Sequence, residues 1–153
     1  MSGIPFPKRT RLPHEVYGNR GYTFHVVFRA MLDTAPFRGE LGGTIWALAV
    51  DEATRPSVRI LAACLMPDHL HVVAQPGDVS LIRWVNNFKS YSTRLAWGEG
   101  RRGALWQPGF FDHLVRDDVE LEATIGYVLR NPVERRLGDS WPWVFERGDR
   151  VRA

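Results

Sequence analysis

The sequence predicts an α+β protein built on a single antiparallel sheet. Strand-like and helix-like segments follow one another in the order strand, helix, strand, strand, helix, strand, helix. Hydrophobic residues make up 44% of the 153 residues and charged residues 24%, which is enough apolar material for one core in one domain. This order of elements is that of a ferredoxin-like split βαβ sheet with an added C-terminal helix, which here carries Tyr127.

The first half of the chain supplies a strand, a helix and a β-hairpin. Residues 22–28 are β-branched and aromatic, as expected of a buried strand. A helix should follow from about Pro36 to Asp51, because apolar residues recur there at helical spacing: Leu41, Ile45 and Leu48. Residues 58–66 then predict a second strand, and the turn signal Pro67-Asp68 leads into a third strand over residues 69–74.

The second half supplies two helices and one more strand. After a break at Pro76-Gly77-Asp78, a second helix is predicted by the apolar stripe Leu81, Val85, Phe88 and Leu95. The glycine-rich residues 98–103 separate it from a short strand over residues 110–115. We expect Asp117 or Asp118 to cap the last helix and Pro132 to terminate it.

Charge and cysteine content narrow the class of protein only slightly. The net charge of +3 and the pI near 9.4 are mildly basic, which alone is weak evidence for a nucleic-acid partner. The one cysteine, Cys64, lies in an apolar run, so no internal disulfide is possible and a reducing compartment is indicated. Residues 1–20 predict an extended basic arm without a signal-peptide stretch. We therefore expect a cytoplasmic protein whose single domain spans residues 21–153 and contains no membrane span.

Basic residues gather in three segments, at the N-terminus, around the second helix and near the C-terminal end. Four interleaved aromatic residues would suit a groove that follows a nucleic-acid backbone and stacks bases: Trp84, Tyr91, Trp97 and Trp106. An ordinary solvated surface fits the same composition, and both interpretations remain open. If DNA is the partner, the candidate contacts are Lys8, Arg9, Arg11, Arg83, Lys89, Arg94, Arg101, Arg102 and Arg130.

Two histidines share one face of the third predicted strand. Because side chains alternate along a strand, His69 and His71 project together while Leu70 and Val72 point to the other face. Two neutral imidazoles at i and i+2 on a rigid strand can chelate one metal ion. On its own the pattern is weak, since two hydrogen-bonded histidines on a partly exposed strand would look the same.

Tyr127 lies away from the apolar stripe of the last predicted helix. That stripe is formed by Leu121, Ile125, Val128 and Leu129, whereas the nearly opposite side carries Glu120, Thr124, Tyr127 and Asn131. A tyrosine that only packs should lie with the leucines, so Tyr127 is the best-placed nucleophile. Asn131, one turn later, could supply a third metal ligand. The rival tyrosines are less suitable, because Tyr22 lies in an apolar strand and Tyr91 close to a core stripe, and Tyr17 remains a rival.

These side chains suggest one type of chemistry. A phenol ionises near pH 10 and is a poor nucleophile at neutral pH, but a metal ion can polarise the phosphodiester that it attacks and stabilise the leaving oxygen. A covalent 5′-phosphotyrosine would conserve the bond for rejoining without a nucleotide cofactor. The sequence thus predicts an enzyme that cuts and rejoins single-stranded DNA, with Tyr127 as nucleophile and His69 and His71 as metal ligands.

Four segments of the chain resemble the REP-associated tyrosine transposases, relatives of the single-tyrosine insertion-sequence transposases of the HUH class. They occur in the family's order and are Met66-Pro67-Asp68-His69-Leu70-His71-Val72-Val73, Phe88-Lys89-Ser90, Leu105-Trp106-Gln107 through Phe111-Asp112-His113, and Tyr127-Val128-Leu129-Arg130-Asn131-Pro132-Val133.

The resemblance implies a ferredoxin-like fold, Mg²⁺ or Mn²⁺ held by His69 and His71, Tyr127 as nucleophile, and recognition of single-stranded or hairpin DNA such as palindromic repeats. In the insertion-sequence relatives a glutamine stands at the position of Asn131, so its ligand role carries over less directly. Such genes resemble host-maintained ones, and cleavage and rejoining at repeat hairpins is therefore expected rather than transposition of the protein's own gene.

Two other functions stay open at this point. A non-catalytic nucleic-acid-binding module would bind single strands without a metal, since ferredoxin-like sheets often present aromatic residues to bases. A metal-dependent phosphodiesterase would use water, with Tyr127 stacking on a base. Trp106 could be a core residue, and Asp112 with His113 could orient the metal site or cap a strand end. The sequence also leaves open a monomer or a homodimer.

Overall fold

The computed structural model describes residues 11–31, 35–137 and 141–148 and contains one five-stranded sheet. All neighbouring strands are antiparallel and follow the order β4-β1-β3-β2-β5. The strands are β1 (Thr23–Arg29), β2 (Val58–Leu65), β3 (His69–Pro76), β4 (Phe111–Val115) and β5 (Val144–Glu146). The predicted α+β class is confirmed, and the first four strands have the predicted split βαβ arrangement.

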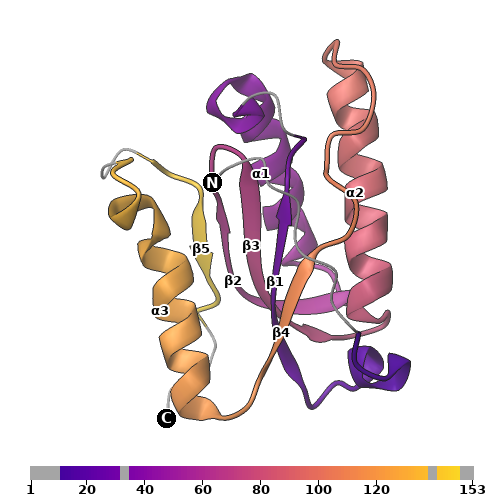
Figure 1. Ribbon diagram of the computed structural model, residues 1–153, viewed down its shortest axis with the longest axis vertical. Helices are drawn as coiled ribbons and strands as arrows, with labels where there is room; N and C mark the ends of the chain where they lie inside the picture. The colour runs from indigo at the N-terminus through magenta and orange to yellow at the C-terminus, as the bar shows by residue number, and fades with distance from the viewer. Residues whose placement is uncertain (1–10, 32–34, 138–140, 149–153) are drawn as a thin grey trace.

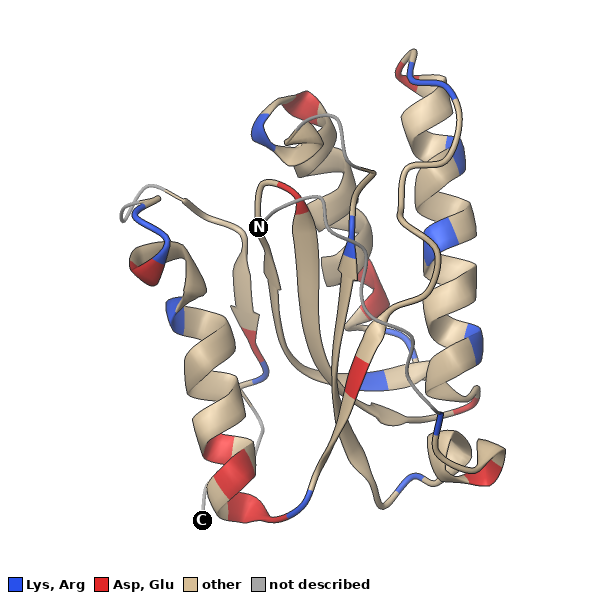
Figure 2. Cartoon of the chain, in the orientation of Figure 1, with Lys and Arg blue, Asp and Glu red and all other residues tan. Residues whose placement is uncertain are grey.

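Helices cover both faces of the sheet. Figure 1 shows α1 (Glu40–Glu52) and α2 (Leu81–Gly98) at one side and α3 (Asp118–Glu134) at the other. Charged residues lie mainly on the helices and near strand ends, and few lie within the central strands (Figure 2). None of the helices in the described part of the chain combines the length and apolar character that a membrane crossing requires.

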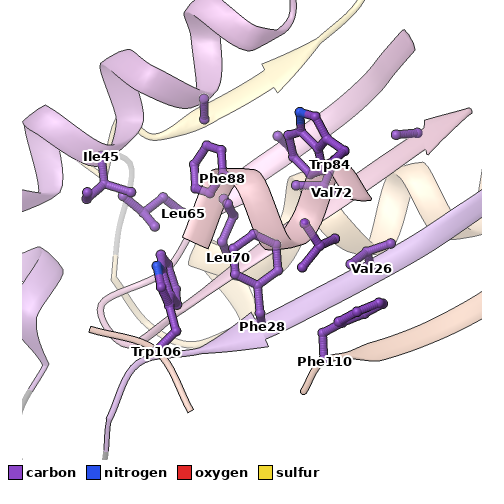
Figure 3. Close-up of a cluster of buried hydrophobic side chains, with 14 of the residues drawn as sticks. Val26, Phe28, Ile45, Leu65, Leu70, Val72, Trp84, Phe88, Trp106 and Phe110 are labelled. Atoms are coloured by element: carbon purple, nitrogen blue, oxygen red, sulfur yellow. The ribbon is translucent and has the colours of Figure 1, made fainter. Parts of the chain in front are cut away.

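The larger core fills the space between the sheet and the helices α1 and α2. Figure 3 shows Phe28, Phe88 and Trp106 meeting there, and the ring centroids of Phe28 and Trp106 are 4.8 Å apart. The indole nitrogen of Trp106 donates to Ser92 Oγ at 2.8 Å, so the one polar atom of this buried ring is satisfied. Trp106 is therefore a core residue that fastens the segment after α2 to the sheet.

The central strand β3 is buried on both faces. Leu70, Val72 and Ala74 point into the larger core, whereas Val73 packs with residues of α3 and β2 in a second, smaller cluster. The period of two along the strand thus assigns odd-numbered residues to the α3 side. This alternation places His69 and His71 on one face, as the sequence predicts, and the structure shows that this face lies under α3.

Two helix boundaries differ from the sequence prediction. Residues Pro36–Arg38 form a separate 3-10 turn, η2, and α1 begins only at Glu40. A Cβ atom at Gly42 would overlap the backbone carbonyl of Phe37, so this glycine permits the tight approach of the two segments.

Pro132 does not terminate α3, which continues to Glu134. A proline removes only one hydrogen bond this close to a helix end. The helix stops instead in a Schellman motif, in which Arg136 adopts φ 60° and the amides of Arg136 and Leu137 donate to the carbonyls of Val133 and Pro132.

The predicted extended arm is wrong for its later residues, and Lys8 and Arg9 lie outside the described residues. His14–Gly18 forms a 3-10 helix, η1, in which Tyr17 is buried. The hydroxyl of Tyr17 donates to Asp112 Oδ2 at 2.9 Å, and the guanidinium of Arg11 donates to the same carboxylate. Asp112 thus anchors this segment to the edge strand β4.

Replacing Asp112 should therefore destabilise the fold. In Asp112→Asn the side chain is neutral and keeps one acceptor oxygen in place of two, so it cannot pair with both Arg11 and Tyr17 as the carboxylate does. We therefore expect the free energy of unfolding to fall by about 3 kcal/mol and Tm to drop by roughly 6–12 °C. Thermal unfolding followed by circular dichroism measures this. The control is Asp78→Asn, which removes an exposed ion pair with Arg20 and should change Tm little. Equal effects of the two substitutions would contradict the anchoring role of Asp112.

Candidate active site

A cavity of about 470 Å³ lies between the sheet and α3. Its lining comes from β1, β3, β4, α3 and the residue that follows α3, and it includes both predicted histidines and the predicted tyrosine. The lining residues are His25, Val27, Arg29, His69, His71, Phe111, Ala123, Thr124, Tyr127 and Arg135.

The two histidines of β3 converge through their Nε2 atoms. His69 and His71 are buried, and their Nε2 atoms are 3.1 Å apart. On the other side of the ring, His69 Nδ1 lies 2.7 Å from Asp68 Oδ1. A ring nitrogen that donates to a carboxylate leaves the lone pair on the other nitrogen, so His69 Nε2 is available as a ligand or acceptor.

Burial keeps both imidazoles neutral. It lowers the pKa of His71 well below its ordinary value, and the neighbouring His69 and His25 lower that pKa further. Burial also lowers the pKa of His69, although the hydrogen bond that its ring donates to Asp68 acts in the opposite direction. Neutral imidazole is the form that binds metal ions, so the pair is ready to act as ligands at neutral pH.

A third histidine, His25 of β1, completes the cluster and is missed by the sequence reasoning. Its Nε2 lies 3.0 Å from His71 Nδ1, and the two rings stack with centroids 5.2 Å apart. Burial, followed by the charge of His113, lowers the pKa of His25 to about 4. The alternation of His25, Val27 and Arg29 on β1 carries a signal, but only the pairing of β1 with β3 shows that these residues face the cavity.

The ring of Tyr127 stands edge-on to this cluster. Its centroid is 5.8 Å from that of His71 and 6.2 Å from that of His25, at interplanar angles of 82° and 71°. The side chain is 41% exposed, which agrees with its predicted place off the apolar stripe and leaves it accessible to a large substrate. The phenol of Tyr127 and the histidine cluster therefore meet within a single copy of the chain.

Asn131 lies less favourably than expected. Its side chain is buried, unlike that of Tyr127 one turn earlier, and it does not line the cavity. Its Oδ1 is buried and has no hydrogen-bond partner among the described residues. A buried acceptor without a donor is costly, and a bound cation would satisfy it.

The donor set fits a divalent ion that keeps open positions. The 3.1 Å between the two Nε2 atoms is close to the roughly 3.0 Å that separates neighbouring ligands of an octahedral ion with bonds of about 2.1 Å. In the part of the chain that the structure describes, no group of three His, Cys, Asp or Glu side chains could hold an ion. Asn131, a substrate phosphate or water would therefore have to supply the other ligands.

Most of the predicted DNA contacts that the structure describes lie away from this cavity. Arg83 and Arg94 are exposed on α2, and Arg101 and Arg102 follow it, on the face of the sheet opposite to α3. Figure 2 shows basic segments along α2 and acidic ones at the start of α3. Arg130 of α3 is exposed, and its Nε atom lies 3.7 Å from Oε1 of Glu134.

Two predicted contacts have structural partners instead. Arg11 donates to Asp112 and lies over the ring of Phe110. Lys89 Nζ donates to the backbone carbonyls of Gln107, at 2.9 Å, and Gly109. Burial lowers the pKa of Lys89 to about 8. This lysine holds the loop before β4 in place.

The structure also places the other polar and tyrosine residues that the sequence offers as candidates. Asp112 points away from the histidines, toward Tyr17 on the other face of the sheet, so it does not orient them. The Nε2 atom of His113 lies 3.2 Å from Oε1 of Glu120 at the start of α3. Tyr17 is buried, and Tyr91 is 49% exposed on α2 rather than close to the core. Both lie across the sheet from the histidine pair and are excluded as partners of it.

Known proteins resemble this chain in sequence or in fold. A protein of Haemophilus influenzae named as a REP-associated tyrosine transposase is 29% identical over 98 residues, which cover 54% of this chain and 56% of the relative. The chain thus matches about half the length of this curated relative. A solved structure of a REP-associated tyrosine transposase bound to a REP hairpin has a TM-score of 0.71 at 19% identity and covers 91% of this chain and 82% of that chain.

The solved structure shows that the fold is shared. The family described as "Transposase IS200 like" matches residues 19–131, a stretch that runs from the end of η1 to the last turns of α3 and contains both histidines and Tyr127. Because this match covers most of the sequence, the chain belongs to the IS200-like transposase family.

Proposed function

We propose that the protein is a metal-dependent enzyme that cuts and rejoins single-stranded DNA at hairpin or palindromic repeats through a covalent 5′-phosphotyrosine. The observation that carries this proposal is the position of the Tyr127 ring against the buried pair His69 and His71. Membership of a transposase family supports DNA strand transfer. The REP hairpin bound by the structural relative supports hairpin DNA as the substrate.

His69 and His71 would hold the ion, Mg²⁺ or Mn²⁺, with Asn131 Oδ1 as a third donor. When bound, the ion supplies polarisation of the non-bridging phosphate oxygens and stabilisation of the leaving oxygen. The low pKa values of the two histidines support this role, because neither ring has to lose a proton before it binds. The unpartnered Oδ1 supports the place of Asn131.

Tyr127 would act as the nucleophile. Its phenol oxygen bonds to the phosphorus, and the bond from phosphorus to the 3′ oxygen of the preceding nucleotide breaks. The phenol gives up its proton to solvent, and the released 3′ oxygen takes one up as a hydroxyl. One ester replaces another, so the reverse attack by a 3′ hydroxyl rejoins the strand without an added energy source.

Arg29 and Arg135 would receive the phosphate that reacts. Both line the cavity, and their charges contribute to the lowered pKa values of His69 and His71. Arg135 is the C-cap residue of α3, where the Schellman motif turns the chain. Guanidinium groups bind phosphate oxygens through paired hydrogen bonds, so these arginines suit the charge that develops during transfer.

The opposite face of the molecule offers a second DNA contact. A hollow of about 720 Å³ lies along α2 and the loop after it, and its lining includes Arg94 and the half-exposed Trp97. A positive groove with an exposed indole suits single strands. This face also favours the second candidate function, a non-catalytic single-stranded nucleic-acid-binding module, which needs neither Tyr127 nor a metal.

Tyr127→Phe should abolish the covalent product. Labelled hairpin DNA incubated with Mn²⁺ and run on a denaturing gel should give a protein-linked band with the wild type, while the variant loses this band and at least roughly 10³-fold in cleavage rate. Tyr91→Phe is the matched control and should keep both. Cleaved DNA with a free 5′ phosphate and no linked band would instead indicate a phosphodiesterase that uses water.

His69→Ala or His71→Ala should abolish cleavage but keep hairpin affinity, measured without divalent ions, within a factor of about three, because binding then rests on phosphate contacts. Fluorescence anisotropy across a salt series measures both affinity and its slope. We expect a slope of log K against log salt of roughly −3 to −5 in the wild type and both variants. Binding that barely depends on salt would contradict the basic contacts, and cleavage retained by both variants would leave the binding-module function.

Arg135→Gln should slow covalent attachment by roughly hundredfold, because one charged donor to the transferring phosphate is lost. The rate of the linked band at saturating DNA measures this step. Arg136→Gln is the control, since Arg136 is exposed and does not line the cavity. Equal rates in the two variants would mean that Arg135 does not contact the reacting phosphate.

A further inference from the structure

His71 can bind a metal ion through Nε2 only if its proton sits on Nδ1. A neutral imidazole carries one proton, and the nitrogen that binds the ion must present a lone pair. The proton on Nδ1 is buried with the ring, so it needs an acceptor. Whichever group accepts it selects the tautomer that binds the ion.

His25 Nε2 is the atom in position to accept this proton. It lies 3.0 Å from His71 Nδ1, whereas the other ring nitrogen of His71 faces His69 at 3.1 Å. The hydrogen-bonded row therefore runs from Asp68 through His69 and His71 to His25. Its distances allow two proton orders, and only the one with the Nδ1 proton of His71 directed at His25 leaves both Nε2 atoms free.

The orientation of the His25 ring is fixed on several sides. β1 pairs with β3 so that Val27 lies opposite His71, which makes His25 a diagonal neighbour within side-chain reach. The ring stacks on His71 at an interplanar angle of 17° and meets Phe111 edge-on at 6.0 Å. Tyr127 meets the third side at 6.2 Å. A group held this tightly can orient a neighbour without contacting the substrate itself.

We infer that His25 is a positioning residue that fixes the tautomer and ring orientation of His71 for metal binding. Asp68 has the corresponding place behind His69, so each ligand has one partner behind it. A partner behind a metal-binding histidine typically contributes 10–100-fold to metal affinity. This inference rests on the proposed function, because it presupposes that His69 and His71 hold the ion.

The test compares three variants of the full chain by Mn²⁺ affinity, measured from the free-Mn²⁺ electron paramagnetic resonance signal. His25→Leu removes the acceptor and should weaken Mn²⁺ binding roughly 10–100-fold. His25→Gln offers an amide oxygen near the place of Nε2 and should recover most of this loss. His113→Gln, on the neighbouring strand and without a hydrogen bond to His71, is the matched control and should bind like the wild type.

Thermal unfolding without metal separates positioning from folding. The inference holds if the leucine and glutamine variants unfold within a few degrees of each other but differ in Mn²⁺ affinity, since a purely structural role would move both measurements together. If His25→Leu and the wild type bind Mn²⁺ with equal affinity, the role of His25 is overturned, whereas the proposed metal centre is not affected. A wild-type chain that binds no Mn²⁺ would overturn both this inference and the metal centre of the proposed function.

Discussion

The candidate site depends on the burial of β3 between two hydrophobic clusters. Leu70, Val72 and Ala74 fill one cluster and Val73 the other, so a slip of one residue would put apolar side chains in the histidine positions and imidazoles in the larger core. The cost of such a slip is the burial of two polar rings without partners. Packing that has no chemical role thus fixes which face carries His69 and His71.

The position of Tyr127 depends on the smaller of these two clusters. Ile125 and Val128 pack on Ala62, Cys64 and Val73, which holds α3 on the sheet and leaves the side chain of Tyr127 partly exposed. Asp117 caps the start of α3 and the Schellman motif ends it, which fixes the length of the helix and with it the place of Arg135. Tyr127, the proposed nucleophile, and Arg135 therefore belong to the same helix and its C-cap, while the histidines belong to the sheet.

Local periodicity predicts the parts of this site that lie within one element. The period of two on β3 and the helical period of α3 place the two histidines together and Tyr127 off the apolar stripe. Residues brought in by pairing or by helix ends escape such reasoning. His25 reaches His71 only through the register of β1 with β3. Arg135 lines the cavity because α3 continues past Pro132, where the sequence predicts that it ends. The strand β5 is not predicted at all, because it has only three residues and its burial does not alternate.

The charges around the cavity suit an ion and a phosphate that arrive together. Arg29 and Arg135 add positive charge beside three neutral histidines, and the carboxylate of Asp68 stands behind one of them. This charge helps to keep His69 and His71 unprotonated, and by the same repulsion it opposes a divalent cation that binds alone. A DNA phosphate in the cavity would neutralise that repulsion. If His69 and His71 hold the ion as proposed, metal and DNA should each strengthen the binding of the other, because linkage between two sites is reciprocal.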